Sequence, residues 1–221
     1  DSGKKTAQEH MQFDTDLLEE GVTHPFLRFY EWSSDAITYG YFIKPDSWLR
    51  TLPQNIARRP TGGGLIFHEN DFSFTLALPL TCSLVNLTAV ERYKMINSQV
   101  VDAIRVILPD CNLLLQSASI HGVIDELCMA NPTHYDILLG SKKVGGAAQR
   151  KNKRCMIHQC SLFLTMPSWA KIEGNLIDSD IILPKLKRFT GSLFAQKDDI
   201  SATFRPLLKA SLQQHLQKIL G

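Results

Sequence analysis

Residues 58–71 read RRPTGGGLIFHEND, with three consecutive glycines between an arginine pair and a short apolar run that ends at His68. An ordered glycine loses conformational entropy and adds nothing to a core. The stretch lacks the Lys-Ser/Thr pair of a phosphate loop, and the strand-like LIF that follows is not the helix of a dinucleotide-binding fingerprint. Two interpretations remain: a backbone that lines an anion, with charge from Arg58 or Arg59, or a tight turn with two solvated arginines.

A second glycine cluster lies in residues 140–154, GSKKVGGAAQRKNKR. Small residues after a lysine leave room for a ligand along the chain, so Lys143 would contact a carbonyl or phosphate oxygen as a point charge. An exposed lysine in a hairpin is the simpler interpretation of the same pattern. The basic tip, residues 151–154, is typical of a solvated loop and would also suit an acidic partner.

The chain has 221 residues, 44% of them hydrophobic, and a net charge of +2. This length suffices for one large domain with its own core. The small charge does not indicate a nucleic-acid-binding face, and no apolar run approaches the length of a membrane helix. Five cysteines without a CxxC pair indicate reduced thiols. With no apolar signal region at its start, the chain is expected to be cytoplasmic, with neither nucleic acid nor membrane as partner.

Helices and strands follow one another without linkers or repeats. Helices are predicted where apolar residues recur at helical spacing, in residues 6–21, 86–110 and 202–220. Gly21 ends the first helix, and Thr88 with Glu91 forms a capping-box pattern at the start of the second, which Pro109 ends.

Strands are predicted where β-branched and aromatic residues cluster, in residues 27–32, 36–43, 72–80 and 155–165. The alternation in FSFTLALPL, residues 72–80, indicates a half-buried strand. Residues 135–150 are expected to form a hairpin that turns at Gly140–Ser141 or through a three-residue loop. The irregular order of elements predicts an α+β fold with a mixed, largely antiparallel sheet packed by helices.

The order of these motifs resembles the lipoate–protein ligase and octanoyltransferase family, which is related to the biotin–protein ligases. RRPTGGGLIFHEND resembles RR-x-[ST]-GGG-x-x-x-H, and KKVGGAAQR resembles K-[VI]-x-G-x-A. Further likenesses are HQCSLFL to H-x-[GC]-[ST]-L, MQFDTDLL to M-x-x-D-x-x-L and ITYGYF to x-x-x-G-[YF]. The Gly-Arg-rich GRGRxGR loop of the biotin branch is absent.

The resemblance implies a fold similar to class II aminoacyl-tRNA synthetase cores, as one catalytic domain over residues 1–221 without an accessory C-terminal domain. It implies attachment of a lipoyl or octanoyl group to a lysine of lipoyl domains, which belong to the 2-oxoacid dehydrogenases and the glycine cleavage H protein. The matching lysine, Lys143, would contact the acyl carbonyl or the phosphate. The implied substrate- or nucleotide-binding residues are Arg58, Arg59, Thr61, Gly62, Gly63, Gly64, His68, Gly145, Gly146, Ala147 and His158.

Two reaction types fit this resemblance. A ligase forms a lipoyl-adenylate from lipoate and ATP with Mg²⁺, and the third glycine, Gly64, is typical of that branch. The alternative is a transferase without cofactor, in which Cys128 takes the acyl group from a carrier-protein thioester. CMANPTHYDILL, residues 128–139, resembles the C-F-x-x-P-[ST]-x-Y-[DE] stretch of that branch, and the short spacing after His68 also fits it.

Each of these interpretations has a simpler counterpart. Cys128 would otherwise be a small buried apolar residue, and the whole chain a member that binds lipoyl domains without catalysis. A zinc site at Cys155, His158 and Cys160 is not expected, because a strand places only two of these on one face and structural zinc takes four ligands.

Overall fold

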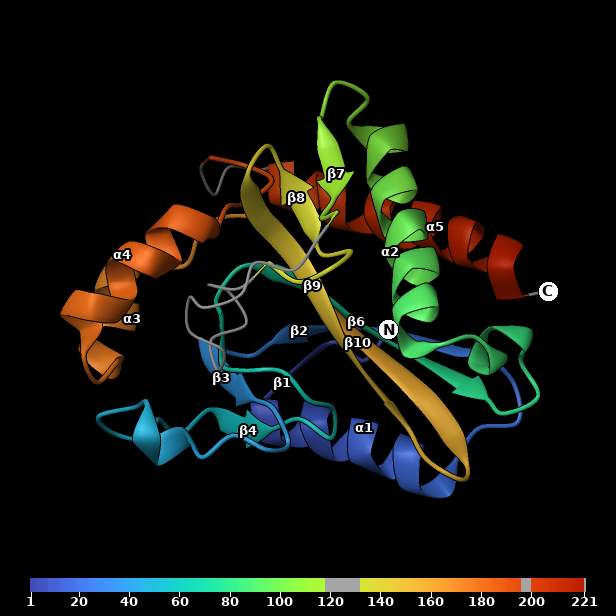
Figure 1. Cartoon of the computed structure of the whole chain (residues 1–221), viewed down its shortest axis with the longest axis horizontal. Coiled ribbons are helices and arrows are strands. Elements are labelled where there is room, and N and C mark those ends of the chain that lie inside the picture. Colours follow the sequence, from blue (N-terminus) through green and yellow to red (C-terminus); the bar gives the residue numbers. More distant parts are fainter. Residues whose placement is uncertain (118–131, 196–199, 221) are drawn as a thin grey trace.

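The computed structural model describes residues 1–117, 132–195 and 200–220, and these form two β-sheets with helices around them (Figure 1). The larger sheet has seven strands in the order β1-β2-β6-β10-β9-β8-β7, and the smaller has three in the order β4-β3-β5. Strands of the larger sheet are β1 Lys4–Lys5, β2 Phe26–Trp32, β6 Asp71–Pro79, β7 Leu113–Leu115, β8 Ile137–Leu139, β9 Lys142–Lys151 and β10 Cys155–Phe163. The smaller sheet contains β3 Ala36–Tyr39, β4 Ile56–Arg58 and β5 Ile66–His68.

All pairs in the two sheets are antiparallel except β1 with β2 and β3 with β4. The predicted α+β fold with a mixed, largely antiparallel sheet is therefore confirmed. The hairpin between β8 and β9 turns at Gly140–Ser141, as predicted, with Gly140 at a φ of 61°.

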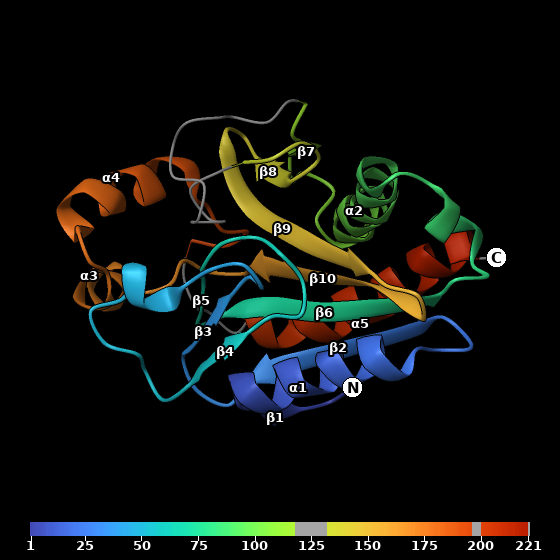
Figure 2. The ribbon, with the colours of Figure 1, turned by 60° about the horizontal axis from the view of Figure 1, so that its bottom comes forward.

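Helices cover both faces of the large sheet (Figure 2). Helices α2 Ala89–Ile107 and α5 Ile200–Leu220 pack together on one face, and α1 Ala7–Glu20 contacts β6 and β10 on the other. Helices α3 Trp169–Asn175 and α4 Ser179–Phe189, which the sequence patterns did not predict, pack beside the small sheet. No helix in the described ranges is long and apolar enough to cross a membrane.

Helices α1 and α2 begin as local sequence dictates. Thr88 and Glu91 form the predicted capping box at the start of α2, in which each side chain satisfies the other's backbone N–H. Thr6 and Glu9 do the same for α1. The first helix ends at Gly21, whose φ of 82° suits glycine.

Strand β6 is buried on both faces, so the prediction of a half-buried strand is wrong. Its apolar face, with Phe72 and Phe74, packs in the core under α2 and α5. Its other face carries Ser73 and Thr75, which are also buried. The alternation does separate an apolar from a polar face, but α1 and the pocket residues cover the polar face. That covered polar face is the floor of the site described below.

The predicted strand at residues 36–43 ends early, at Tyr39. The chain turns at Gly40, where an added Cβ would lie 1.8 Å from the carbonyl oxygen of Gly63. Glycine is therefore required for the end of β3 to touch the loop between β4 and β5, residues 59–65, which is called the glycine-rich loop below. The four cysteines within the described ranges are free thiols.

Candidate active site

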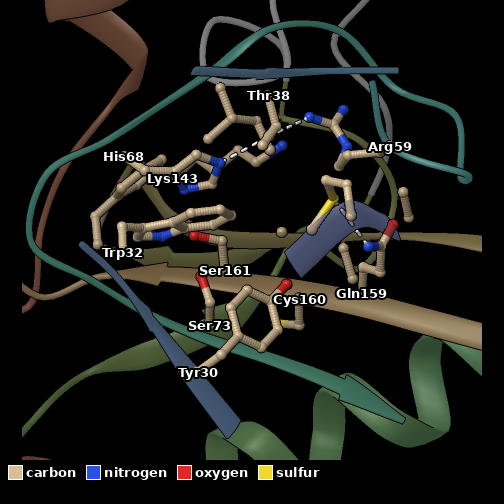
Figure 3. A pocket seen from close by; sticks show the side chains of 16 residues that line it. Tyr30, Trp32, Thr38, Arg59, His68, Ser73, Lys143, Gln159, Cys160 and Ser161 are labelled. Carbon is tan, nitrogen blue, oxygen red and sulfur yellow. Dashed lines mark hydrogen bonds between the residues drawn. The ribbon is translucent and has the colours of Figure 1, made fainter. Parts of the chain in front are cut away.

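A pocket opens between the two sheets and encloses about 570 Å³ of space not filled by atoms, including solvent at its mouth (Figure 3). Strand β10 forms one wall, and the small sheet with the glycine-rich loop forms the opposite one. The exposed wall surface is mostly apolar, which suits an acyl chain better than a polar ligand. The lining residues are Met11, Tyr30, Trp32, Thr38, Arg59, Ile66, His68, Ser73, Lys143, Gly146, Ala147, Ala148, Gln159, Cys160, Ser161 and Phe163.

Lys143 brings a buried positive charge to this pocket. Its Nζ lies 2.7 Å from Oδ2 of Asp136, and neither side chain is more than 7% exposed. Asp136 also accepts hydrogen bonds from the hydroxyl of Tyr93 and from the backbone N–H and hydroxyl of Thr133. The Tyr93 oxygen in turn accepts the N–H of Ala147 at 2.7 Å. This network stabilises a buried ion pair, which would be costly without such partners.

A β-bulge decides on which face Lys143 lies. Opposite β8, Ile137 pairs with Gly145 and Leu138 pairs with Lys143, so β9 carries one extra residue at Val144. Simple alternation would place Lys143 with Gly145 and away from Gly146. The bulge reverses this: Val144 and Gly145 face the helical core, whereas Lys143 shares the pocket face with Gly146.

Gly146 leaves the space that the Lys143 side chain crosses. A Cβ at Gly146 would lie 2.7 Å from Cε of Lys143 and 2.8 Å from Oδ1 of Asp136. Gly145 has a different role, because a Cβ there would meet Cδ2 of Leu162 at 2.3 Å in the core. The two glycines of KKVGGAA therefore serve opposite faces of the same strand.

The arginine pair of the first motif points in two directions. Arg59 is 4% exposed and lines the pocket, where its guanidinium donates to the carbonyl oxygens of Gly62 and Gly64 at 3.1 and 2.6 Å. Arg58 is exposed and lies over the ring of Tyr41 outside the pocket. Arg59 thus holds the glycine-rich loop from within.

Thr61 and Gly63 shape the same loop. The hydroxyl of Thr61 donates to Oε1 of Gln159 at 2.5 Å, and Nε2 of Gln159 donates to Asp14 at 2.6 Å. Gly63 has a φ of 85°, which a residue with a side chain rarely adopts. Asp14 is itself paired with Arg28 at 3.0 Å, so α1 anchors the loop through two buried side chains.

His68 is held by a carboxylate and a hydroxyl. Its Nδ1 lies 2.9 Å from Oδ2 of Asp71, and its Nε2 lies 2.7 Å from the hydroxyl of Thr38. The ring of Trp32 packs against it, with 4.1 Å between the two ring centres. Arg59 donates to the same Thr38 hydroxyl at 2.8 Å, as the dashed lines of Figure 3 show. His68 is therefore oriented as part of the pocket wall.

Asp71 is an ionised anchor beneath the pocket. Burial alone would raise its pKa, but the ion pair with His68 and hydrogen bonds from His68, Ser161 and Ser73 outweigh burial and hold the pKa well below its ordinary value. Ser73 and Ser161 come from β6 and β10, so this one carboxylate joins both central strands to His68.

The structure brings together Arg59, His68, Lys143, Gly146 and Ala147 as pocket-lining residues. It does not place the rest of the predicted set on the pocket wall. Arg58 faces outward, Gly145 packs in the core, and Thr61 with Gly62, Gly63 and Gly64 builds the loop. Cys128 lies outside the described residues.

His158 was predicted as a binding residue, but it faces α2 rather than the pocket. It is fully buried between Phe74 and Tyr93, with Nδ1 3.0 Å from Nε2 of Gln149. Burial and then the nearby charge of Arg92 lower its pKa to about 3. The residues of this strand that line the pocket are Gln159, Cys160, Ser161 and Phe163.

Asp136 and Tyr93 were missed as site residues. A signal existed for Asp136: it lies four residues before Gly140 and Lys143 lies two residues after Ser141, so the two flank one hairpin. Tyr93 gave no such signal, because it is one residue of the amphipathic helix α2 and only packing brings it to β9.

The sequence profile of the lipoyl protein ligase A/B catalytic domain matches residues 6–176. The chain is 25% identical, over 177 residues and 74% of its length, to octanoyltransferase LipM of Anoxybacillus flavithermus. It spans 64% of the length of that relative.

Two solved structures share the fold. A bipartite lipoate protein ligase of Thermoplasma acidophilum, studied with its E2 lipoyl domain, has a TM-score of 0.68 at 17% identity and covers 97% of this chain and 81% of its own. A lipoate–protein ligase A bound with ATP has a TM-score of 0.69 at 18% identity, over 97% and 83% of the two chains. The lipoate-ligase-like fold implied by the motifs is thereby confirmed.

Proposed function

The chain belongs to the family of lipoyl protein ligase A/B catalytic domains, and from this premise we propose that it transfers an octanoyl or lipoyl group to a lysine of a lipoyl domain. The observation that carries the proposal is the buried Lys143–Asp136 pair beside a largely apolar pocket. An apolar pocket accommodates the acyl chain, and a fixed cation suits the polar carbonyl end.

Lys143 would act by stabilising charge in the transition state. When the acceptor amine attacks the acyl carbonyl carbon, a C–N bond forms and negative charge develops on the carbonyl oxygen. An ammonium group held by Asp136 needs little reorganisation to stabilise that oxygen. The bond to the leaving group then breaks, and the acceptor nitrogen loses its proton.

The favoured acyl donor is a carrier-protein thioester. Support comes from the relative named octanoyltransferase LipM and from Cys128, whose sequence context resembles the acyl-carrying cysteine of that branch. In this route the Cys128 thiolate replaces the carrier thiolate at the carbonyl carbon, and the acceptor lysine then replaces Cys128. No ATP is consumed.

ATP-dependent ligation is the second candidate. A Cβ at Gly62 would have no other heavy atom within 4 Å beyond its chain neighbours, so the glycine-rich loop borders open space there. Such space would admit the larger leaving group of an acyl-adenylate. A solved lipoate–protein ligase of this fold is bound with ATP, which makes ATP with Mg²⁺ and lipoate the substrates to test.

One assay compares the donors. The protein is incubated with a lipoyl domain and either octanoyl-carrier protein or lipoate with MgATP. The molecular mass of the lipoyl domain is then measured by mass spectrometry. We expect the octanoyl mass increase from the carrier thioester. Product only from lipoate with MgATP would assign the ligase reaction instead, and binding of the lipoyl domain without product from either donor would reject catalysis.

A further inference from the structure

Two guanidinium groups share one aromatic ring outside the pocket. Cζ of Arg58 lies 4.7 Å and Cζ of Arg150 lies 4.4 Å from the ring centre of Tyr41. These distances are those of cation–π contacts, which hold a cation in place without neutralising it. Arg150 is further fixed by a hydrogen bond of 2.8 Å to the carbonyl oxygen of Pro60, at the base of the glycine-rich loop.

Neither arginine forms a salt bridge with any carboxylate in the part of the chain that the structure describes. Arg58 is exposed, Arg150 is half-buried, and Tyr41 is 38% exposed. Two positive charges at one place repel each other, and the ring and the Pro60 carbonyl partly offset that repulsion. Positive charge arranged in this way attracts an anion.

A groove that continues the acyl pocket is lined by Tyr41, Arg58 and Arg150. Met11 and Arg59 line both cavities, so the groove begins where the pocket ends. Three arginines line the groove, and Glu19 is the only carboxylate among its described lining residues. The local charge is therefore positive along the path from the surface to Arg59.

We propose that Arg58, Tyr41 and Arg150 form a phosphate-binding subsite for the acyl donor. This rests on the proposed function, because both donor types carry a phosphate: a carrier thioester holds it at the far end of its phosphopantetheine arm, and an acyl-adenylate holds it next to the reacting carbonyl. Planar guanidinium groups match the geometry of phosphate oxygens. The subsite recognises the donor through its phosphate and not through its acyl chain.

The test compares donors that differ only in the phosphate. Octanoyl-4′-phosphopantetheine and octanoyl-pantetheine are titrated into the protein by calorimetry, which needs no turnover. We expect the phosphorylated compound to bind about tenfold more tightly, as for one charge-assisted contact. Arg58→Gln with Arg150→Gln should abolish that difference and leave octanoyl-pantetheine binding unchanged. Tyr41→Ala should reduce the difference, whereas Tyr41→Phe should preserve it.

Lys153→Gln is the matched control. Lys153 is an exposed cation in the turn between β9 and β10, and it is not among the residues that line the groove. It should leave the tenfold difference intact. An equal difference in the wild type and the double arginine variant overturns the subsite. So does a double variant that weakens only lipoyl-domain binding, which would assign the arginines to protein docking.

A parallel titration with AMP and adenosine separates the two phosphate sources. Loss of AMP discrimination in the double variant, with pantetheine discrimination absent in the wild type, assigns the subsite to the nucleotide. Absence of any phosphate preference in the wild-type protein refutes the subsite even if acyl transfer occurs. Phosphate-dependent binding without transfer would instead refute the proposed function and leave the subsite standing.

Discussion

The side chain of Lys143 crosses β9 directly over Gly146, so that a single added carbon on Gly146 would lie 2.7 Å from Cε of the lysine. The bulge at Val144 creates this relationship, because it places both residues on the pocket face. Activity should therefore depend on the absence of a side chain at Gly146.

Gly146→Ala should lower the rate of acyl transfer at least tenfold, because the Lys143–Asp136 pair must move to admit the methyl group. Steady-state rates with a saturating donor test this. Gly145→Ala is the matched control, since its methyl group would meet Leu162 in the core. That variant should lose about 1–3 kcal/mol of unfolding free energy from overpacking, with a smaller effect on rate per folded molecule. The reverse pattern would contradict the assigned faces.

Lys143→Ala should abolish transfer and also destabilise the protein. Removing the lysine leaves Asp136 buried without its cation, which costs about 3–5 kcal/mol in comparable pairs. Urea unfolding monitors this loss. The double variant Lys143→Met with Asp136→Asn removes both charges and should recover most of the stability without recovering activity. Near-normal turnover in either variant would contradict the catalytic role of Lys143.

The acyl group should be found on Cys128 and not on Cys160. Cys160 lines the pocket, but burial, followed by the negative charge of Asp136, raises the pKa of its thiol far above the ordinary value. A thiol that stays protonated is a poor nucleophile. Peptide mass spectrometry after brief exposure to octanoyl-carrier protein locates the adduct.

Cys128→Ser should remove that adduct and slow transfer from the thioester, whereas Cys160→Ala should retain both within about threefold. Full activity of Cys128→Ser would argue against the thioester route. In that case the ATP-dependent reaction should be intact in both variants.

Acid should destabilise the fold through its buried histidines. Burial lowers the pKa of His158 to about 3 and is the largest cause that lowers the pKa of His10 to about 4. Because the unfolded chain takes up these protons near pH 6.5 and the folded chain does not, stability is full above pH 6.5 and falls as the pH drops toward the folded values. Each histidine should contribute roughly 1.4 kcal/mol per pH unit in that window.

Unfolding free energies at pH 7.0, 6.0 and 5.0 test this slope. His10→Gln and His158→Gln should each flatten the curve by about one proton. His24→Gln, at an exposed position, is the control and should leave the slope unchanged. A slope that persists in both buried variants would contradict the prediction.

Local sequence was sufficient for much of the fold. The capping box of Thr88 and Glu91, the stop at Gly21 and the turn at Gly140–Ser141 depend on residues a few positions apart, so the sequence displays both partners together. The alternation of β6 likewise identified its two faces. It did not show that the polar face is buried, since α1 and the pocket residues that cover that face come from elsewhere in the chain.

The motifs indicate which segments line the pocket, but not which way each side chain points. Arg58 and Arg59 are adjacent in the sequence. The side chain of Arg58 nevertheless lies on Tyr41 outside the pocket, whereas that of Arg59 holds the glycine-rich loop from inside the pocket. The motif that His158 opens predicts a place in the site, but its side of β10 faces α2. Direction depends on which element covers each face, and that information is not local.

The sequence by itself determined the fold class, the main helices, the hairpin and the family, because capping, alternation and motif order are recorded in neighbouring residues. Only the tertiary structure decided that Lys143 meets Asp136 over Gly146 in the pocket. A strand's period of two assigns faces only while the strand is regular. The bulge at Val144 shifts that period by one residue, and its position follows from the pairing of β9 with β8.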